Sequence, residues 1–412
     1  MRILILTQWF EPEPAFKGLS FAKELQRLGH QVEVITGFPN YPGGKLYQGY
    51  NLSLYKKERI DGVSVIRVPL YPSHDSSPLK RILNYLSFAF SAATIGSVLA
   101  SSADVLYVYH PPATVGFAAI AIKLFRRIPF VYDIQDLWPD TLHTTGMVKK
   151  GFILKATGFF CRFVYTQASA LSVLSPGFKT RLIERGVPER KINIIYNWTD
   201  EESYNAEMQK PISKTRIGFN NKFNVVFAGN MGKAQSLDVV LKAAEKLQNL
   251  YPKIQFVFIG DGVEVVRLKR IKKEKKIRNV CFIDRVSKSK IGYYLSLSDV
   301  LVVHLKKDPL FKITIPSKVQ SYMKAGKPIL LGGEGDVADL VNNSGCGVVC
   351  VPGCSNSLAE GVVQLFEMSE LQRIQMGNCG KKFYDDNLSF SIGIAATLQV
   401  FNSIFSKKWK TR

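Results

Sequence analysis

Residues 302–328 read VVHLKKDPLFKITIPSKVQSYMKAGKP. The first residues form an apolar run typical of a buried strand, and a loop with three lysines follows them. Pro316 is placed to open a helix, which Gly326 would close. The first turn of a helix exposes backbone N–H groups that attract anions, and Ser317 and Lys318 add a hydroxyl and a charge there. The stretch therefore predicts a strand, a loop and a helix that carry a phosphate site, with a capped helix and solvated lysines as the simpler alternative.

The same alternation of strand and helix continues on both sides of this stretch. Continuous apolar runs separated by helical periodicity predict mostly parallel strands that are covered on both faces. Because 412 residues are too many for one core, we predict two doubly wound α/β domains. The first spans residues 1–198 and the second 199–385, with residues 386–412 packing back onto the first. The predicted strands are 2–7, 32–36, 105–109, 130–134, 171–174 and 192–197, then 225–227, 254–259, 280–283, 300–305, 329–331 and 348–351.

The charge of the chain restricts its partners. A net charge of +22 and a pI near 9.6 indicate an anionic partner, such as nucleic acid, a membrane surface or phosphorylated small molecules. Nucleic acid is not expected, because no zinc-finger, RRM or KH pattern is present. The six cysteines form no paired CxxC motif, so that no metal site is expected. A strand-like run instead of a signal peptide at the start predicts a cytoplasmic protein.

Two segments combine basic residues with large apolar ones. They cover residues 79–100 and 149–168, and we expect no apolar run to reach the length of an uninterrupted membrane span. Helices of this composition lie in the headgroup layer of anionic membranes, where lysines meet lipid phosphates and aromatic rings sink below them. The alternative is a pair of core helices whose lysines extend to the surface. Peripheral contact with the inner face of the cytoplasmic membrane is therefore a hypothesis.

Polar and glycine-rich loops follow the predicted strands. In parallel sheets, ligands bind at the carboxyl ends of the strands, so that these loops predict a site. A nicotinamide cofactor is not expected, because no GxGxxG motif is present. The residues of the first domain are Glu11, Lys17, Gly18, His110, Asp136 and Trp138. Those of the second domain are Gly229, Asn230, Gly232, Lys233, Gly260, Asp261 and Gly262.

Together these features resemble the GT-B glycosyltransferases, in particular the large fourth family of retaining enzymes. The resemblance covers nearly the whole chain and implies two Rossmann-like domains that face a central cleft. Within this family, the sequence most resembles transferases of O-antigen and capsule assembly that handle N-acetylated 6-deoxy amino sugars such as L-fucosamine. The motifs occur in the order of the family, at 10–12, 37–42, 133–138, 174–175, 186–188, 191–192, 197, 227–230, 259–262, 315–318 and 326–328.

The resemblance implies roles for these residues. The nucleotide diphosphate would lie against residues 229–233 and the helix start at Pro316, Ser317 and Lys318, with Arg285 in the segment that holds the base. Lys233 and Lys318 would stabilise the departing phosphates, and the glycine-rich loops around Gly229 and Gly260 would complete the donor site. Neither a metal nor another cofactor is implied.

The sequence departs from the family in two places. A pair of glutamates that binds hydroxyl groups of the donor would fall at Ile313 and Ser321, which are not acidic. Gln320 or Lys312 could replace them, or the donor sugar could have fewer free hydroxyls. Many relatives have a histidine where this sequence has Gln135. The next residue, Asp136, could orient or deprotonate the acceptor hydroxyl. A helix cap is the alternative role of Asp136.

These observations predict a retaining transferase that moves a sugar such as N-acetyl-L-fucosamine from a UDP-sugar to a polyprenyl-diphosphate-linked saccharide. Glu11, Lys17, Gly18, His110 and Trp138 would lie on the acceptor side. The alternatives are a nucleotide-sugar epimerase of the same fold and a basic scaffold that binds membranes or nucleic acid.

Overall fold

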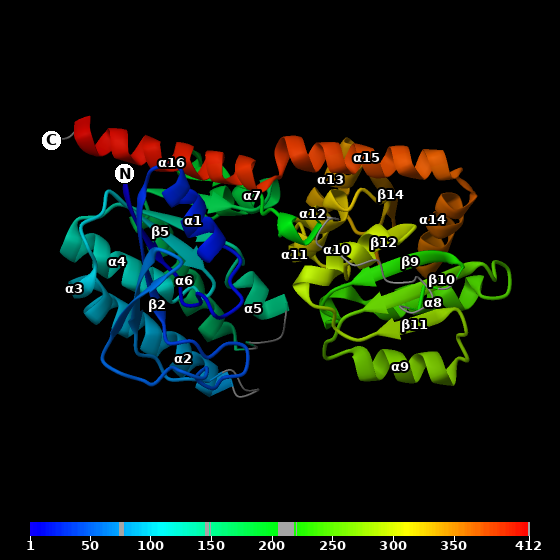
Figure 1. Ribbon diagram of the computed structural model, residues 1–412, viewed down its shortest axis with the longest axis horizontal. Helices are drawn as coiled ribbons and strands as arrows, with labels where there is room; N and C mark the ends of the chain where they lie inside the picture. The colour runs from blue at the N-terminus through cyan, green and yellow to red at the C-terminus, as the bar shows by residue number, and fades with distance from the viewer. Residues whose placement is uncertain (74–77, 145–147, 149, 205–217, 220, 411–412) are drawn as a thin grey trace. The chain divides into compact units, whose positions relative to one another are not determined.

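The computed structural model describes the chain except residues 74–77, 145–147, 149, 205–217, 220 and 411–412 (Figure 1). It divides into two compact units, which we call unit 1 and unit 2. Unit 1 comprises Met1–Ile195 and Ile394–Arg412, and unit 2 comprises Tyr196–Gly393. Each unit contains one sheet, mostly or entirely parallel, with helices on its faces, which confirms the predicted pair of Rossmann-like folds. The assignment of acceptor and donor to these units stays a prediction.

The sheet of unit 1 has the strand order β3-β4-β2-β1-β5-β6-β7-β8. Only β3 and β4 pair antiparallel, and they form a hairpin whose turn is Asp61 and Gly62. The strand order reverses between β1 and β5, so that the loops after these two strands flank the topological switch point. The strands are β1 Arg2–Leu6, β2 Gln31–Gly37, β3 Lys56–Ile60, β4 Val63–Val68, β5 Val105–His110, β6 Phe130–Ile134, β7 Ala170–Val173 and β8 Ile192–Ile194.

Helices cover both faces of this sheet. Its central strands are mostly apolar, and residues 3–6 of β1 are at most 1% exposed. The last helix, α16, lies mostly in unit 1, where Phe401 packs edge-on against Tyr107 of β5 with ring centroids 5.7 Å apart. The helices are α1 Leu19–Arg27, α2 Pro78–Ser91, which continues through η1 Ala92–Gly96 into α3 Ser97–Leu99, α4 Val115–Arg126, α5 Asp140–Thr144, α6 Gly151–Gln167, α7 Pro176–Glu184, η2 Glu189–Lys191 and α16 Phe390–Lys410.

The sheet of unit 2 is parallel throughout, with the order β11-β10-β9-β12-β13-β14. Its switch point lies between β9 and β12. The strands are β9 Phe223–Ala228, β10 Ile254–Ile259, β11 Val280–Ile283, β12 Val300–His304, β13 Ile329–Gly332 and β14 Gly347–Cys350. The helices are η3 Glu201–Tyr204, η6 Lys233–Gln235, α8 Leu237–Leu247, α9 Val265–Glu274, α10 Lys288–Ser296, α11 Pro309–Lys312, α12 Ser317–Lys324, α13 Asp336–Ser344, α14 Ser355–Glu367 and α15 Glu370–Asn387.

The strand predicted at the start of residues 302–328 is β12, and the predicted helix is α12. Pro316 is the N-cap of α12, and Gly326 follows its end with φ +65°, which confirms both signals. The loop between them contains an additional short helix, α11, that the sequence pattern did not predict. The Asp308 carboxylate caps α11 by accepting the Leu310 N–H at 2.9 Å.

Two helical stretches, Leu79–Leu99 and Glu370–Ser406, are long and apolar enough to cross a membrane by length and composition alone. The expectation that no apolar run reaches this length is therefore wrong. In each stretch 44% of the apolar window is buried inside the protein, as also happens in helices that pack on a sheet.

Candidate active site

Two glycine loops meet at the carboxyl edge of the sheet in unit 2. Gly229 follows β9 and Gly260 follows β10, with φ angles of +134° and +133°. A Cβ atom on Gly260 would lie 2.1 Å from the carbonyl oxygen of Gly229, and one on Gly262 would lie 2.5 Å from that of Met231. The Met231 N–H donates to the carbonyl of Asp261 at 2.7 Å. The loops therefore pack backbone against backbone, which only glycine permits at these positions.

Lys318 places its ammonium against the first of these loops. A Cβ atom on Gly229 would lie 3.5 Å from Lys318 Nζ, and the ammonium is 3.7 Å from the ring centroid of Phe227. Nζ is buried and has no hydrogen-bond partner among the described residues. Burial lowers the pKa of Lys318 to about 7. A cation that has lost water and gained no acceptor is suited to bind an anion.

The start of α12 adds backbone donors to this position. Pro316 makes no side-chain cap, and no acidic residue lies in the first turn of this eight-residue helix. The N-terminal end of the helix dipole and the Lys318 ammonium therefore favour the same negative charge. Gly229, Gly260, Gly262 and Lys318, which the sequence placed in three separate loops, are brought together.

The other predicted donor residues are exposed on neighbouring loops of the same unit. Lys233 begins η6, directly after the glycine loop, and Arg285 follows β11. Asn230 and Asp261 are exposed beside their glycines, and Asp261 Oδ1 accepts the Gly262 N–H at 2.7 Å. Ser317 is exposed in the first turn of α12.

His304 is a positioning residue that the sequence analysis did not single out. Its Nδ1 lies 2.7 Å from the Gln235 carbonyl, and its Nε2 accepts the Gly353 N–H at 3.2 Å. These roles require the neutral ring with the proton on Nδ1, and burial lowers the pKa of His304 accordingly. The ring ties η6, which carries Lys233, to the loop after β14. A polar residue at the end of an apolar strand was the available signal.

Ser321, one of the two positions that lack glutamate, has a partner within the protein. The Ser321 hydroxyl lies 2.8 Å from the Thr199 hydroxyl. Gln320 is buried, and with its amide turned so that the nitrogen faces the helix start, it donates to the carbonyls of Pro316 and Ser317 at 3.0 Å each. That Gln320 replaces a missing glutamate stays a prediction.

Glu334 lies beside the other position, Ile313. A Cβ atom on Gly335 would lie 2.1 Å from the carbonyl oxygen of Lys312, so that the loop after β13 touches the end of α11. Glu334 Oε2 is 3.4 Å from Lys312 Nζ, while Oε1 is buried and has no hydrogen-bond partner among the described residues. The carboxylate missing at 313 is thus matched by one from the neighbouring loop, which sequence spacing could not indicate.

In unit 1, Lys17 forms a buried ion pair with Asp133. Their charged atoms are 2.8 Å apart, and both side chains are 0% exposed. Asp133 also accepts hydrogen bonds from Tyr107 at 2.6 Å and from Gln135 and Ser172 at 2.7 Å each. The prediction that Lys17 faces the acceptor is therefore wrong. Removing one partner of such a pair costs about 3–5 kcal/mol, so that Lys17 serves the fold of its loop.

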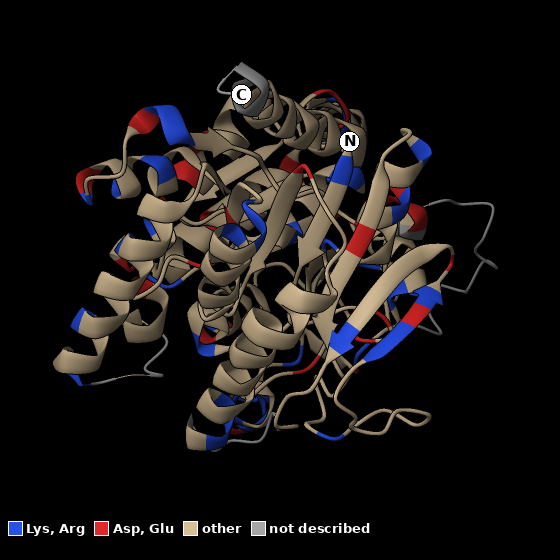
Figure 2. Cartoon of the chain, turned by 90° about the vertical axis from the view of Figure 1, so that its left-hand side faces the viewer, with Lys and Arg blue, Asp and Glu red and all other residues tan. Residues whose placement is uncertain are grey.

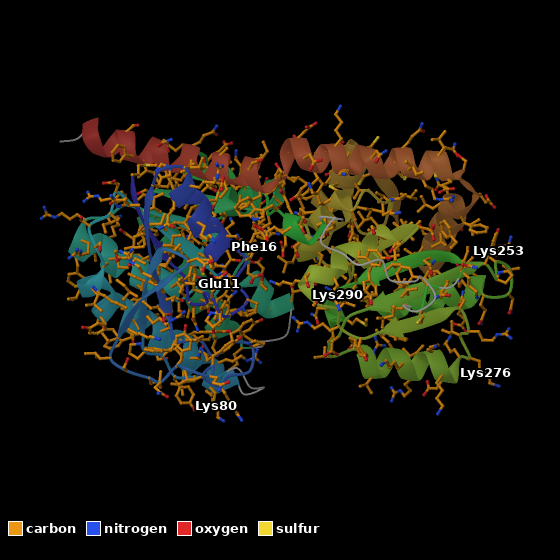
Figure 3. All side chains as sticks on the ribbon, viewed as in Figure 1. Glu11, Phe16, Lys80, Lys253, Lys276 and Lys290 are labelled. Carbon is orange, nitrogen blue, oxygen red and sulfur yellow. The ribbon has the colours of Figure 1, made fainter. Side chains whose placement is uncertain are left out.

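Glu11 is likewise held by the protein itself. Its Oε2 accepts the Leu19 N–H at 2.9 Å, at the positive end of helix α1. A Cβ atom on Gly18 would lie 2.7 Å from either carboxylate oxygen, which explains the glycine. These contacts give Glu11 and Gly18 a structural role, and their place on the acceptor side stays a prediction. Figure 3 labels Glu11 on this loop.

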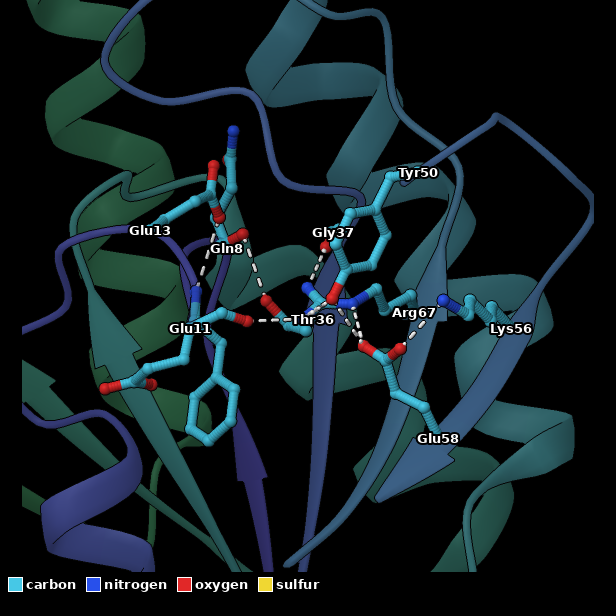
Figure 4. A network of polar contacts seen from close by, with 10 residues as sticks. Gln8, Glu11, Glu13, Thr36, Gly37, Tyr50, Lys56, Glu58 and Arg67 are labelled. Carbon is cyan, nitrogen blue, oxygen red and sulfur yellow. Dashed lines mark hydrogen bonds and ion pairs between the residues drawn. The ribbon is translucent and has the colours of Figure 1, made fainter. Parts of the chain in front are cut away.

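A polar network fixes the loops after β1 and β2 (Figure 4). The Glu13 carboxylate accepts the N–H groups of Asn40 and Tyr41 at 2.7 Å each, and burial raises its pKa to about 7. Figure 4 shows Glu13 together with Arg67 and the partners of Arg67. Arg67 donates to the Gly37 carbonyl at 3.0 Å and to the carbonyl of Glu11. The edge of the sheet around the switch point is therefore rigidly organised.

His110, which is buried, and Asp136, which is half-buried, are two further titratable groups at this edge. His110 is 2% exposed, its Nδ1 has no partner among the described residues, and burial lowers its pKa to about 3. Its ring lies 5.8 Å from that of Trp138. Burial raises the pKa of Asp136, as suits a proton acceptor. No hydrogen bond from a helix N–H to its carboxylate occurs in the described part of the chain, so that the helix-cap alternative has no support.

Aromatic side chains accompany Asp136. Burial raises the pKa of Tyr85 and of Tyr109, and the negative charge of Asp136 adds to both shifts. The Trp9 ring lies 6.4 Å from that of Tyr85 and 4.9 Å from that of Tyr41. Half-buried aromatic rings beside a carboxylate suit the apolar faces and hydroxyl groups of a sugar. Sequence reasoning missed these rings because they come from three separate loops and helices.

Comparison with known families identifies the chain. Residues 19–198 match the glycosyl transferase 4-like domain, and residues 209–383 match the glycosyl transferases group 1 domain. The chain is a group 1 glycosyltransferase. The two matches fall on the two sets of strands described above, and the glycosyltransferase therefore has the GT-B type of fold that its sequence resembles.

Curated relatives agree with this assignment. The glycosyltransferase is 25% identical over 351 residues to WcaI of Escherichia coli K12, which is named for colanic acid biosynthesis. The alignment covers 81% of this chain and 84% of WcaI. It is also 25% identical over 331 residues to WbjE of Pseudomonas aeruginosa, named as a glycosyltransferase, covering 78% and 80% of the two chains.

Solved structures share the fold. HepE of Anabaena in complex with UDP-glucose superimposes with a TM-score of 0.70 at 16% identity, covering 98% of this glycosyltransferase and 100% of that chain. WaaG, a glycosyltransferase involved in lipopolysaccharide biosynthesis, gives a TM-score of 0.64 at 15% identity, covering 96% and 99%.

Proposed function

We propose that this glycosyltransferase moves a sugar from a UDP-sugar to a polyprenyl-diphosphate-linked saccharide, with retention at the anomeric carbon, in the assembly of an O-antigen or a capsule. The observation that carries the proposal is the buried ammonium of Lys318, which lies against the Gly229 loop and the start of α12 and has no hydrogen-bond partner among the described residues. It offers one cation and unpaired backbone donors to a diphosphate. The names of WcaI and WaaG support a polysaccharide product.

In the proposed reaction, the bond between the anomeric carbon and the diphosphate oxygen breaks as the acceptor oxygen binds that carbon. Negative charge grows on the departing diphosphate, and Lys318 and Lys233 stabilise it more in the transition state than in the ground state. Asp136 accepts the proton of the acceptor hydroxyl, for which its raised pKa suits it. The reaction as proposed uses no metal ion or other cofactor.

The proposed donor sugar is an N-acetylated 6-deoxy amino sugar such as N-acetyl-L-fucosamine. Glu334 supplies the carboxylate that binds a hydroxyl of this sugar. Its Oε1 lacks a partner among the described residues, and Lys312 offsets its negative charge near the diphosphate. A single carboxylate of this kind suits a sugar with few free hydroxyls. The protein would act in the cytoplasm, at the inner face of the cytoplasmic membrane, where such acceptors are anchored.

Replacing Glu334 by glutamine is expected to weaken binding of the nucleotide sugar about 10-fold and to leave UDP affinity within about twofold. The reason is that a hydrogen bond to a charged acceptor contributes about 1.5–3 kcal/mol, and UDP lacks the sugar. Titration calorimetry with both ligands measures this. Glu360→Gln, an exposed change on α14, is the matched control. Equal losses for UDP and the nucleotide sugar would exclude Glu334 from sugar binding.

A binding panel tests the proposed function itself. UDP, GDP and dTDP are compared by thermal shift, and UDP is expected to raise the melting temperature most. UDP-sugars are then tested with lipid-linked acceptors extracted from bacterial membranes, and product anomers are assigned by NMR. No stabilisation by any nucleotide diphosphate would refute the donor site.

A further inference from the structure

We infer that helices α2, α4 and α6 of unit 1 together form a docking surface for an anionic lipid bilayer. The sequence indicated two separate basic and apolar segments, whereas the structure joins them through α4 into one layer. The inference rests on the proposed function in one respect: a lipid-linked acceptor gives the protein a reason to bind a membrane. The surface itself is argued from exposure, contacts and charge.

The three helices are neighbours. Helix α4 packs against both α2 and α6. A Cβ atom on Gly116 of α4 would lie 2.7 Å from Val164 of α6, and Lys123 Nζ donates to the Gln167 carbonyl at 2.7 Å. The Thr114 hydroxyl donates to the Tyr85 carbonyl of α2 at 3.3 Å. Apolar residues that these helices expose therefore belong to one continuous layer.

Each helix exposes large apolar side chains with helical spacing. Phe152 and Phe159 of α6 are 82% and 77% exposed, Phe125 of α4 is 77% exposed, and Phe90 of α2 is 65% exposed. Positions i, i+3, i+4, i+7 and i+11 lie on one face of a helix, as the exposed residues of α2 do. The exposed set is Leu79, Ile82, Leu83, Leu86 and Phe90 of α2, Phe117, Leu124 and Phe125 of α4, and Phe152, Ile153, Phe159 and Phe163 of α6. Exposure of this extent marks an interaction surface.

Charge decides what covers this surface. Residues 78–100, 115–127 and 150–167 contain no aspartate or glutamate, although the chain has 33 acidic residues. Their basic residues are Lys80, Arg81, Lys123, Arg126, Arg127, Lys150, Lys155 and Arg162. Figure 2 shows basic residues at the ends of the foreground helices and little charge along their length, and Figure 3 labels Lys80 near the start of α2. A second copy would oppose basic residues with basic residues, whereas anionic headgroups over an apolar layer match both properties.

A groove on α6 fits the same occupant. It has a volume of about 480 Å³ and is lined by apolar residues such as Leu154 and Phe159 and by the cations Lys155 and Arg162. An acyl chain below a lipid phosphate has this combination of apolar and anionic parts.

Flotation with vesicles tests the inference. The full-length protein is expected to float with vesicles of phosphatidylglycerol and phosphatidylethanolamine, and at least fivefold less with phosphatidylcholine or in high salt. The variant Phe152→Ser/Phe159→Ser should reduce the bound fraction at least fivefold. The matched control Leu371→Ser/Ile374→Ser, which changes exposed apolar residues of α15 in unit 2, should bind as the wild type does.

The thermal shift with UDP is measured on every variant, so that folding and the donor site are assessed separately from membrane binding. A retained UDP shift with lost flotation supports the surface. Wild-type flotation of the α6 variant, equal loss in the control, or a dimer in solution that the α6 changes dissociate would overturn it. If UDP causes no shift in any variant but flotation depends on α6, the proposed function fails and the docking surface stands.

Discussion

Replacing Lys318 by methionine is expected to weaken UDP binding about 100-fold, or about 2.7 kcal/mol, and to lower turnover at least as much. The substitution removes the only charge that contacts the Gly229 loop from α12 while keeping a side chain of similar length. Because the ammonium is buried without a partner in the described chain, its loss should leave the melting temperature of the free protein unchanged or higher. Calorimetry and thermal unfolding measure the two effects.

Lys253→Met is the matched control for this variant. Lys253 is exposed and directly precedes β10, at the amino end of the sheet in unit 2, and is labelled in Figure 3. Its variant should bind UDP as the wild type does. If Lys318→Met bound UDP with wild-type affinity, the diphosphate would not bind at Lys318.

The Lys318 ammonium should also make the UDP affinity of the wild-type protein depend on pH. The pKa of Lys318 in the free protein is lowered to about 7, and a bound diphosphate would raise it again. UDP affinity should therefore be highest below pH 7 and fall by up to about tenfold per unit between pH 7 and 9, with a proton taken up on binding. In Lys318→Met this dependence should disappear. Calorimetry in two buffers of different ionisation enthalpy detects the proton.

Replacing Asp136 by asparagine is expected to lower turnover by about 10²–10³-fold and to leave UDP affinity within about twofold. The amide keeps the shape of the side chain but accepts no proton from the acceptor. The rate of UDP release from the nucleotide sugar chosen by the panel measures turnover. The wild-type rate should fall at acid pH as the raised pKa of Asp136 is crossed, and this fall should be absent from the variant.

Asp61→Asn is the control for Asp136, because Asp61 lies in the exposed hairpin turn of unit 1 and asparagine tolerates its positive φ. It should retain wild-type turnover. Unchanged turnover in Asp136→Asn would exclude Asp136 from the reaction, and a loss of UDP binding in the same variant would indicate a structural role.

The sequence predicted the sheets and the glycine loops because buried parallel strands leave continuous apolar runs, and because the φ angle of Gly229 favours glycine while Gly260 and Gly262 have no space for a side chain. It placed the helix start at Pro316 correctly for the same local reasons. It failed where a side chain turns back into its own unit. Lys17 and Glu11 lie at the expected edge of the sheet, but the partner that removes Lys17 from that edge, Asp133, is distant in sequence.

Glu334 illustrates the opposite failure. Family spacing directed attention to Ile313 and Ser321, and no pattern of spacing connects these positions to the loop after β13. Only the contact between Gly335 and Lys312 brings this carboxylate to the end of α11. Tertiary proximity of this kind has no local sequence signal.

The backbone packing of the two glycine loops limits how this enzyme can change its donor. Any side chain at Gly260 or Gly262 would displace the neighbouring loop, so that a mutational search there would return unfolded or inactive proteins. Libraries that aim to accept a new sugar should instead vary residues 306–313 and 333–334, which lie outside the strands of the sheet.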